Sequence, residues 1–280
     1  MPDYSANKLR STYRAIALDL DGTLTNNKKE VTPLTRDTLL KAQERGANII
    51  LASGRPTYGI APVADTLELD KRGGYILSYN GGNIVDWKTK ATLYSTHLPD
   101  NAIPLIIEYA HKNKFALLGY SGKDIITESP DDKYVHEESR INKMQIRKVD
   151  NLLCQLDPHP TKLLMTGEPY NMQQAEQDMK NILGDKMDAY RSAPFFLELV
   201  PKGIDKARSL LRLLAMLNLT PHDMIAFGDG YNDLSMLRLA GMGVAMENAA
   251  PEVRAEADYV TASNEDEGVA KAIEALCYNN

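Results

Sequence analysis

The sequence predicts an α/β protein with a doubly wound parallel sheet, into which an α+β cap domain is inserted. Short apolar runs alternate with helical segments toward both ends of the chain, as in parallel sheets covered by helices on both faces. In the middle, strand patterns follow one another without helical crossovers, which is typical of an antiparallel sheet. We therefore expect a Rossmann-like core made of residues 1–90 and 199–280 and a cap domain made of residues 91–198.

The first part of the core begins with a buried strand at 15–18, because this run is short, continuously apolar and ended by a glycine turn. A helix is expected next over 32–46, since a Thr-Pro pair opens it and a glycine closes it. Two more apolar runs, at 47–52 and 74–79, predict the second and third strands.

The middle of the chain predicts a different arrangement. A helix is expected over 103–113, and a polar stretch of mixed charge covers 131–150. The other expected elements are short strands at 115–120, 124–128, 162–165 and 195–200, and a helix at about 171–183. From residue 202 onward the alternation returns, with a helix over 206–217, a strand over 224–227, a helix ending at 240 and strands at 243–245 and 257–261.

Composition argues against several functions. The 280-residue chain has a net charge of −6 and no dense run of lysine and arginine, which argues against a nucleic-acid partner. Residues 1–12 are polar and no apolar run reaches membrane-spanning length, so we expect no membrane partner and a soluble, cytoplasmic protein. Cys154 and Cys277 lie far apart and outside any metal-binding spacing. We expect them to be free thiols in a protein of a reducing compartment. Because the chain is acidic overall, an anionic substrate would need local positive charge from a metal, a lysine or helix N-termini.

Two aspartates, Asp19 and Asp21, follow the first strand and precede a glycine. Side chains two residues apart on an extended chain point the same way, so both carboxylates leave the strand tip together. Like charges this close raise each other's pKa unless a cation lies between them, so the pair predicts cation binding or a shared proton. A calcium-binding EF-hand loop is an alternative, because Glu30 falls at the twelfth position counted from Asp19. Two features argue against it: the sixth position is Leu24, where that loop requires glycine, and the segment follows a strand and not a helix. A plain Asp-Gly turn is the remaining alternative for this segment alone.

Polar residues also follow three other predicted strands, at Ser53-Gly54-Arg55, at Asn80-Gly81 and from Asp229 to Asp233. Ligands of open α/β sheets bind beyond the carboxyl ends of the strands, so we expect these residues near Asp19 and Asp21. Together the carboxylates of Asp19, Asp21 and Asp229 can form a hard oxygen site, which suits Mg²⁺. For Asp229 alone, the alternative is a simple Gly-Asp turn.

Ser53 and Lys206 each allow a structural and a functional interpretation. Ser53 stands before an expected helix, where serine is commonly an N-cap. With the N–H groups of Gly54 and Arg55, the same position forms an anion cradle. Lys206 opens another expected helix; by itself it predicts a solvated surface lysine, and it becomes a phosphate clamp only together with the other strand-end groups.

Four motifs occur in a fixed order along the chain. They are Asp-x-Asp-Gly-Thr-Leu at 19–24, Ser-Gly-Arg-Pro at 53–56, Lys-Gly-x-x-Lys at 202–206 and Phe-Gly-Asp-Gly-x-Asn-Asp at 227–233. This set resembles the haloacid dehalogenase superfamily of phosphohydrolases. The large insertion between the second and third motifs, and the segments at 244–249 and 257–261, are more narrowly similar to the Cof-type sugar phosphatases. The motifs cover the core on both sides of the insertion, while the cap matches by position and coarse pattern only.

The resemblance implies a role for each motif residue. Asp19 would be the nucleophile and Asp21 the general acid/base. Lys206 is preferred over Lys202 as the phosphate clamp, because it matches the later lysine of the family pattern and lies at a helix start. The implied Mg²⁺ ligands are Asp19, Asp21 through its backbone carbonyl, Asp229 and Asp233, the last supporting either the metal or Lys206. The implied phosphate-binding residues are Ser53, Gly54, Lys206 and Asn232, the last with the metal as an alternative partner.

The implied function is a Mg²⁺-dependent phosphatase that hydrolyses small phosphate monoesters, above all sugar phosphates, through an aspartyl-phosphate. Its partner would be a small phosphorylated metabolite, and the cap would act as a lid. Two alternatives stay open: a phosphosugar mutase or phosphotransferase, and a catalytically silent binding protein of the same fold. The presence of both motif aspartates, Lys206 and Asp229 argues against the silent protein.

Overall fold

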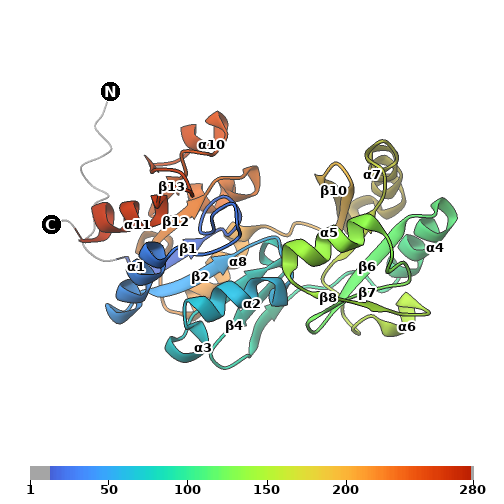
Figure 1. Ribbon diagram of the computed structural model, residues 1–280, viewed down its shortest axis with the longest axis horizontal. Coiled ribbons are helices and arrows are strands. Elements are labelled where there is room, and N and C mark those ends of the chain that lie inside the picture. The colour runs from blue at the N-terminus through green and yellow to red at the C-terminus, as the bar shows by residue number, and fades with distance from the viewer. Residues whose placement is uncertain (1–12, 279–280) are drawn as a thin grey trace. The chain divides into compact units, whose positions relative to one another are not determined.

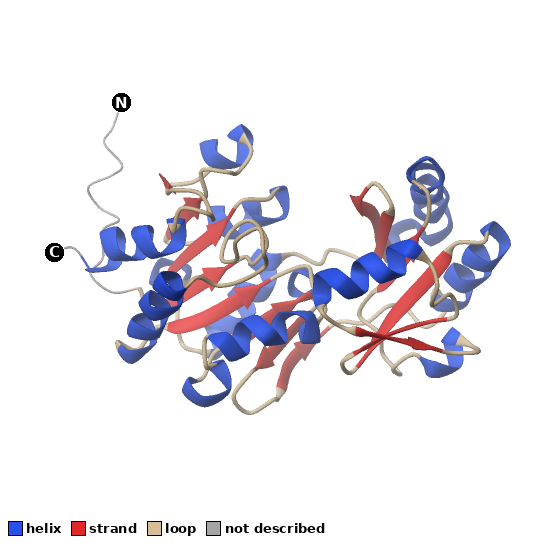
Figure 2. Cartoon of the chain, viewed as in Figure 1, coloured by secondary structure: helices blue, strands red, loops and turns tan. Residues whose placement is uncertain are grey.

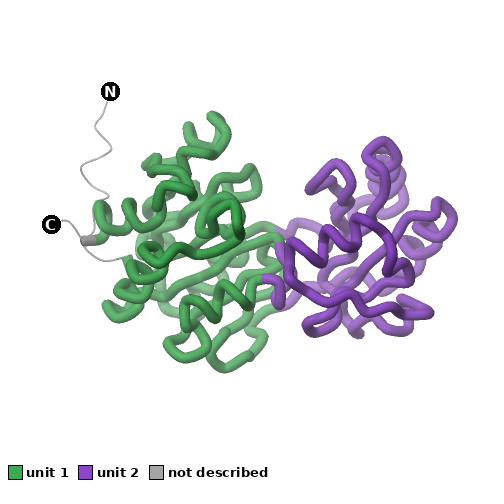
Figure 3. The backbone as a smooth tube through the Cα atoms, in the orientation of Figure 1, with its two compact units in different colours: residues 1–54, 60–94, 205–280 green, residues 55–59, 95–204 purple. Residues whose placement is uncertain are grey.

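The computed structural model describes residues 13–278, and the chain divides into two compact units (Figure 3). The first unit holds the residues up to 54, residues 60–94 and the residues from 205 onward; the second holds residues 55–59 and 95–204. The expected limits at 90 and 198 stay a prediction. One strand of the eight-stranded sheet ends at Ser95, and one strand of the six-stranded sheet ends at Pro201.

The polar segment 1–12, from which we expect no membrane anchor, lies outside the described residues. Within residues 13–278, no helix combines the length and the apolar composition that crossing a membrane requires.

The first unit is built on an eight-stranded sheet with the strand order β14-β13-β12-β1-β2-β3-β4-β5 (Figures 1 and 2). Its strands are β1 (Ala15–Leu18), β2 (Asn48–Ala52), β3 (Tyr75–Ser78), β4 (Asn83–Asp86), β5 (Thr92–Ser95), β12 (Met224–Gly228), β13 (Met242–Ala245) and β14 (Tyr259–Val260). Neighbours from β14 to β3 pair in parallel, whereas β4 is antiparallel to β3. The sequence pattern did not predict β4 and β5. The connection between β3 and β4 is too short for the crossover that a parallel neighbour needs.

Helices of this unit pack on both faces of the sheet (Figure 2). They are α1 (Pro33–Glu44), α2 (Thr57–Thr66, of which residues 60–66 belong to this unit), α3 (Leu69–Arg72), α8 (Lys206–Met216), α9 (Leu234–Leu239), α10 (Pro251–Ala255) and α11 (Gly268–Ile273). Ile16 and Leu18 of β1 share a core cluster with apolar residues of α1, α2 and α11. Ala15 and Ala17 belong to a second cluster, with residues of α8 and α9. Because alternate side chains of a strand point to opposite faces, β1 is buried on both sides, and the predicted doubly wound core is confirmed.

Two helix starts are capped by the residues that precede them. Thr32 accepts the N–H of Thr35 at the start of α1, where proline occupies the first turn. Asp205 caps α8 by accepting the N–H of Arg208 at 3.0 Å. The second cap fixes the first turn of α8, which carries Lys206.

The second unit contains a six-stranded sheet with the order β10-β11-β9-β6-β7-β8. Its strands are β6 (Ala116–Ser121), β7 (Asp124–Thr127), β8 (Gln145–Lys148), β9 (Leu163–Thr166), β10 (Met187–Ala193) and β11 (Phe196–Pro201). Its helices are α4 (Ile103–Asn113), α5 (Lys133–Asn142), α6 (Leu152–Gln155) and α7 (Pro169–Leu183). Neighbouring strands are antiparallel except for the parallel pair β7–β8. The predicted α+β insertion is thereby confirmed.

The sequence pattern did not predict β10, or α5 and β8 within the polar stretch 131–150. On the packed face of α5, the polar residues Glu138 and Asn142 are buried beside Val135, so the helix shows no continuous apolar stripe. Tyr120 donates a hydrogen bond to Glu138 at 2.6 Å, which offsets part of the cost of burying this carboxyl group.

Candidate active site

The candidate site lies at the carboxyl edge of the core sheet, where β1 and β12 end side by side (Figure 1). These strands pair in parallel with Leu18 opposite Phe227, so Asp19 and Asp229 follow neighbouring strand ends. The backbone N–H of Asp19 donates to the carbonyl of Phe227 at 3.0 Å and extends the ladder by one step. Two acidic motifs that are far apart in the sequence therefore meet at one edge, as expected for this fold.

A buried lysine joins these two motifs. Lys206 Nζ lies 2.6 Å from Asp19 Oδ1 and 2.6 Å from Asp233 Oδ1, and the residue is only 1% exposed. Lys202 instead forms an ion pair with Asp188 of β10, at 2.8 Å within the second unit. Of the two lysines in this motif, the structure places Lys206 against Asp19.

Asp233 organises both the lysine and the loop after β12. Its Oδ1 accepts from Lys206, while its Oδ2 accepts the backbone N–H groups of Asp229 at 3.1 Å and Gly230 at 2.9 Å. Both carboxylate oxygens of Asp233 thus have hydrogen-bond donors, as the supporting role toward Lys206 requires.

The carboxylates around Asp19 form an oxygen-rich group that fits a divalent cation. Asp19, Asp229 and Asp233 each offer an oxygen, and these oxygens lie within 4.8 Å of one another. Thr23 Oγ1 donates to Asp229 Oδ1 at 2.7 Å and orients that carboxylate. A side chain at Gly22, whose φ is +84°, would overlap Asp229, so only glycine lets the carboxylate approach this loop. A hard donor set of this kind suits Mg²⁺.

Burial shifts the pKa values of this cluster. Burial and the charge of Asp233 raise the pKa of Asp19 to about 8, although Lys206 acts in the opposite direction. Burial opposes protonation of Lys206, but the charges of Asp19 and Asp233 raise the pKa of its ammonium group. Burial also raises the pKa of Asp229. With more carboxylates than ammonium groups, the cluster favours an additional cation or a retained proton.

Asp21 lies beside this cluster, but its side chain has a different partner. Its Oδ1 lies 2.6 Å from Lys29 Nζ, and the Asp21 side chain is 36% exposed. A carboxyl group near the surface is accessible to a leaving group and to water, as the acid/base role requires. The motif analysis missed Lys29, because this residue stands outside all four motifs.

The predicted phosphate-binding residues are linked through Asn80. Ser53 follows β2 at the same edge and is buried, and its carbonyl accepts the N–H of Asn80 at 2.9 Å. The Asn80 side chain accepts from Asn232 Nδ2 at 3.2 Å. A Cβ at Gly54 would lie 3.1 Å from the Asn80 amide nitrogen, so the glycine permits this close contact. The sequence predicted that Asn80 lies near Asp19 and placed Thr23 in the first motif, but it gave neither residue a role in the site.

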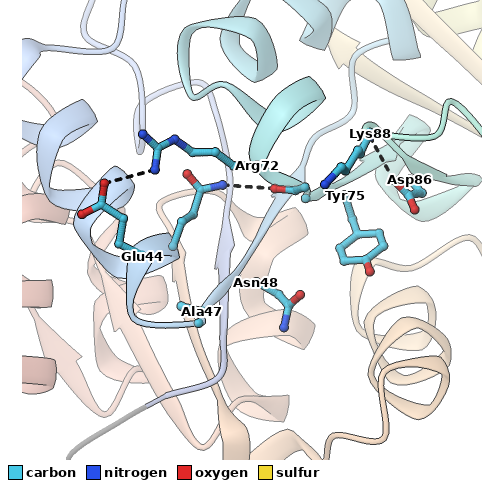
Figure 4. A pocket seen from close by; sticks show the side chains of 11 residues that line it. Glu44, Ala47, Asn48, Arg72, Tyr75, Asp86 and Lys88 are labelled. Carbon is cyan, nitrogen blue, oxygen red and sulfur yellow. Dashed lines mark hydrogen bonds and ion pairs between the residues drawn. The ribbon is translucent and has the colours of Figure 1, made fainter.

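A cavity of about 500 Å³ lies elsewhere in the first unit, at the amino ends of β2 and β3 (Figure 4). Arg72 donates to Glu44 at 3.1 Å there, and the backbone N–H of Lys88 donates to Asp86 at 2.9 Å. Ligands of this fold bind at the carboxyl ends of strands, so this cavity is not part of the candidate site.

Comparison with known proteins decides the family. Residues 16–273 match the family described as haloacid dehalogenase-like hydrolase. The chain belongs to the haloacid dehalogenase-like hydrolases. The membership that the four motifs predicted is confirmed.

Relatives of this hydrolase match along nearly their whole length. The crystal structure of a haloacid dehalogenase-like hydrolase from Bacteroides thetaiotaomicron is 47% identical, with a TM-score of 0.93 over 95% of this chain and 100% of that chain. The Bacillus subtilis (strain 168) protein named "Putative phosphatase YxeH" is 31% identical over 94% of this chain and 98% of its own. From the same organism, "5-amino-6-(5-phospho-D-ribitylamino)uracil phosphatase YwtE" is 28% identical over 94% of this chain and 98% of its own.

The fold is also that of BT4131, which is described as a sugar phosphatase of subclass IIB of this superfamily. That structure is 22% identical, with a TM-score of 0.77 over 94% of this chain and 98% of that chain. With relatives of this coverage named phosphatases, this hydrolase is a phosphatase, as the sequence predicts.

Proposed function

We propose that this hydrolase is a Mg²⁺-dependent phosphatase of small phosphate monoesters, with sugar phosphates as its substrate class, acting through an aspartyl-phosphate on Asp19. The observation that carries the proposal is the 2.6 Å contact of Lys206 Nζ with Asp19 Oδ1, beside a group of carboxylate oxygens. YwtE supports the substrate class, since the substrate in its name carries a phosphorylated ribityl chain. The free thiols Cys154 and Cys277 support a cytoplasmic location.

In the first half-reaction, a carboxylate oxygen of Asp19 attacks the phosphorus atom of the ester. The phosphorus–oxygen bond to the leaving group breaks, and Asp21 donates its proton to the departing alkoxide. Lys206 offsets the repulsion between Asp19 and the phosphate dianion. Ser53 and the N–H group of Gly54 would hold the phosphate oxygens.

In the second half-reaction, water attacks the phosphorus atom of the aspartyl-phosphate and gives its proton to Asp21. The bond between phosphorus and Asp19 breaks, which restores the carboxylate and releases inorganic phosphate. Two displacements replace one difficult hydrolysis, and each has a lower barrier.

Mg²⁺ would be held by Asp19, Asp229 and the backbone carbonyl of Asp21, while Asp233 holds Lys206 and the adjacent loop. When bound, the ion would supply positive charge that offsets the charge of the phosphate group. The surplus of carboxylates over ammonium groups in this cluster supports that assignment. Asn232 stays a candidate contact for phosphate or metal.

Removal of Mg²⁺ is expected to abolish turnover, because the carboxylate cluster would then repel the phosphate dianion. The test measures phosphate release from a panel of sugar phosphates, nucleotides and pyridoxal phosphate, in Mg²⁺ and in EDTA. We expect Mg²⁺-dependent release that is fastest for sugar phosphates. Release that is unchanged in EDTA contradicts the metal, and faster release from nucleotides contradicts the substrate class. Isomerised phosphosugar appearing before free phosphate would identify a mutase instead.

Asp21→Asn is expected to impair esters with poor leaving groups most, because only these need a proton as they depart. We expect a loss of about a hundredfold in kcat on a sugar phosphate and a much smaller loss on p-nitrophenyl phosphate. Steady-state kinetics on both esters measures the difference. Equal losses on the two esters would argue against the acid role of Asp21.

A further inference from the structure

Lys29 lies outside the four motifs but contacts one of their residues. Its Nζ is 2.6 Å from Asp21 Oδ1, and the two side chains are 38% and 36% exposed. Ion pairs this exposed contribute little to the stability of a fold. The consequence of the contact to test is therefore its effect on the orientation of Asp21, and not its effect on folding.

A tight turn fixes the backbone at Lys29. The side-chain oxygen of Asn26 accepts the N–H groups of Lys28 and Glu30, each at 3.0 Å. The backbone of Asn26 adds two bonds: its N–H donates to Glu30 at 3.0 Å, and its carbonyl accepts from Lys29 at 2.8 Å. Lys29 itself has a φ of +61°, a left-handed conformation that is unfavourable for a residue with a side chain. The turn thus fixes the backbone from which the Lys29 side chain extends to Asp21.

We propose that Lys29 is a positioning residue: by donating to Oδ1 of Asp21, it holds the carboxyl group in one orientation for proton transfer through Oδ2. This inference rests on the proposed function, in which Asp21 is the general acid/base. The group must lie within hydrogen-bond reach of the leaving oxygen, and a partly exposed aspartate occupies several rotamers unless a partner restrains it. A cation on a rigid turn restricts that choice, and orientation of a catalytic group contributes directly to rate.

The kinetic test compares Lys29→Met, which removes the charge and keeps the length, with Lys29→Arg and with Lys28→Met. Lys28 is the matched control, because it is an exposed lysine on the same turn. For Lys29→Met we expect kcat on a sugar phosphate to fall about tenfold with little change in KM, and kcat on p-nitrophenyl phosphate to stay within about twofold. Lys29→Arg should recover most of the rate, and Lys28→Met should leave it unchanged. An equal loss on both esters would make Lys29 a phosphate contact and overturn the inference, as would no loss at all.

A second measurement does not depend on turnover. Crystal structures of the unsubstituted protein and of Lys29→Met are expected to show one Asp21 rotamer in the former and more than one in the latter. The same single rotamer in both would overturn the inference. A protein that fails to hydrolyse any ester, yet shows this change of rotamer, would count against the proposed function and not against the positioning role.

Discussion

Asp19→Asn is expected to lower turnover by on the order of 10⁴-fold or more while the protein stays folded. The amide cannot form the phosphoryl bond, and no other carboxylate takes its place: Asp233 accepts from Lys206 and the loop, and Asp229 accepts from Thr23. The measurement is phosphate release in Mg²⁺ from the best ester of the panel, with circular dichroism to show the fold. A variant with a near-normal rate would remove Asp19 from the nucleophile role.

The same substitution is expected to stabilise the metal-free protein at alkaline pH. The pKa of Asp19 is raised from 3.8 to about 8, so between these values the folded state keeps a proton that the unfolded state has released. Stability from this group is therefore complete below pH 3.8 and is lost as the pH rises through about 8. Asparagine does not titrate, so the variant does not lose this stability as the pH rises. In the variant, the Lys206 ammonium group pairs with a single carboxylate, that of Asp233.

Thermal unfolding in EDTA tests this expectation. The melting temperature of Asp19→Asn should exceed that of the unsubstituted protein at pH of about 8, and the difference should shrink toward pH of about 5. A lower melting temperature for the variant at the higher pH would mean that the contact between Lys206 and Asp19 outweighs the cost of burying the second carboxylate.

Lys206→Met is expected to destabilise the protein by about 3–5 kcal/mol, because it removes the ammonium group that both buried carboxyl groups, Asp19 and Asp233, contact. The Lys206 side chain is fully buried, and it lies 2.6 Å from both Asp19 and Asp233. Turnover of the remaining folded protein should fall about a hundred- to a thousandfold, since the charge opposite the phosphate is gone. Urea unfolding and phosphate release measure the two effects.

Lys202→Met is the matched control for this experiment. Lys202 is 54% exposed in its pair with Asp188, so its loss should cost no more than about 1 kcal/mol and leave turnover unchanged. The reverse pattern would assign the phosphate clamp to Lys202. In the double variant Lys206→Met/Asp233→Asn, stability should partly return and activity should not, which separates the structural effect from the catalytic one.

Much of the core could be predicted because its signals are local. The strand at 15–18 coincides with β1, and the cap and proline at Thr32-Pro33 begin α1 as expected. The rule that ligands gather at the carboxyl ends of parallel strands also predicted that Asp19 and Asp229 meet. The strand and the helix start are encoded by residues within a few positions of them. The meeting of Asp19 and Asp229 follows instead from the right-handed connections that all parallel α/β sheets share.

The cap was less predictable, since its burial is not purely apolar. α5 presents Glu138 and Asn142 to the interior, and their cost is met by partners such as Tyr120 on another strand. The hydropathy pattern along the chain does not predict that a polar residue is buried when its hydrogen-bond partner is distant in sequence.

By itself, the sequence determined the fold class, the strand ends that carry polar residues, and the acidic motifs that meet there. The tertiary structure placed Lys206, which the motif comparison already preferred over Lys202, against Asp19. Only the tertiary structure showed that Lys29 contacts Asp21, that Thr23 donates to Asp229 and that Asn80 accepts from Asn232. Hydrophobic periodicity and helix caps depend on residues that are close in sequence. Ion pairs between distant residues depend on which turns and helices become neighbours when the protein folds. Those contacts are non-local, and no single segment encodes them.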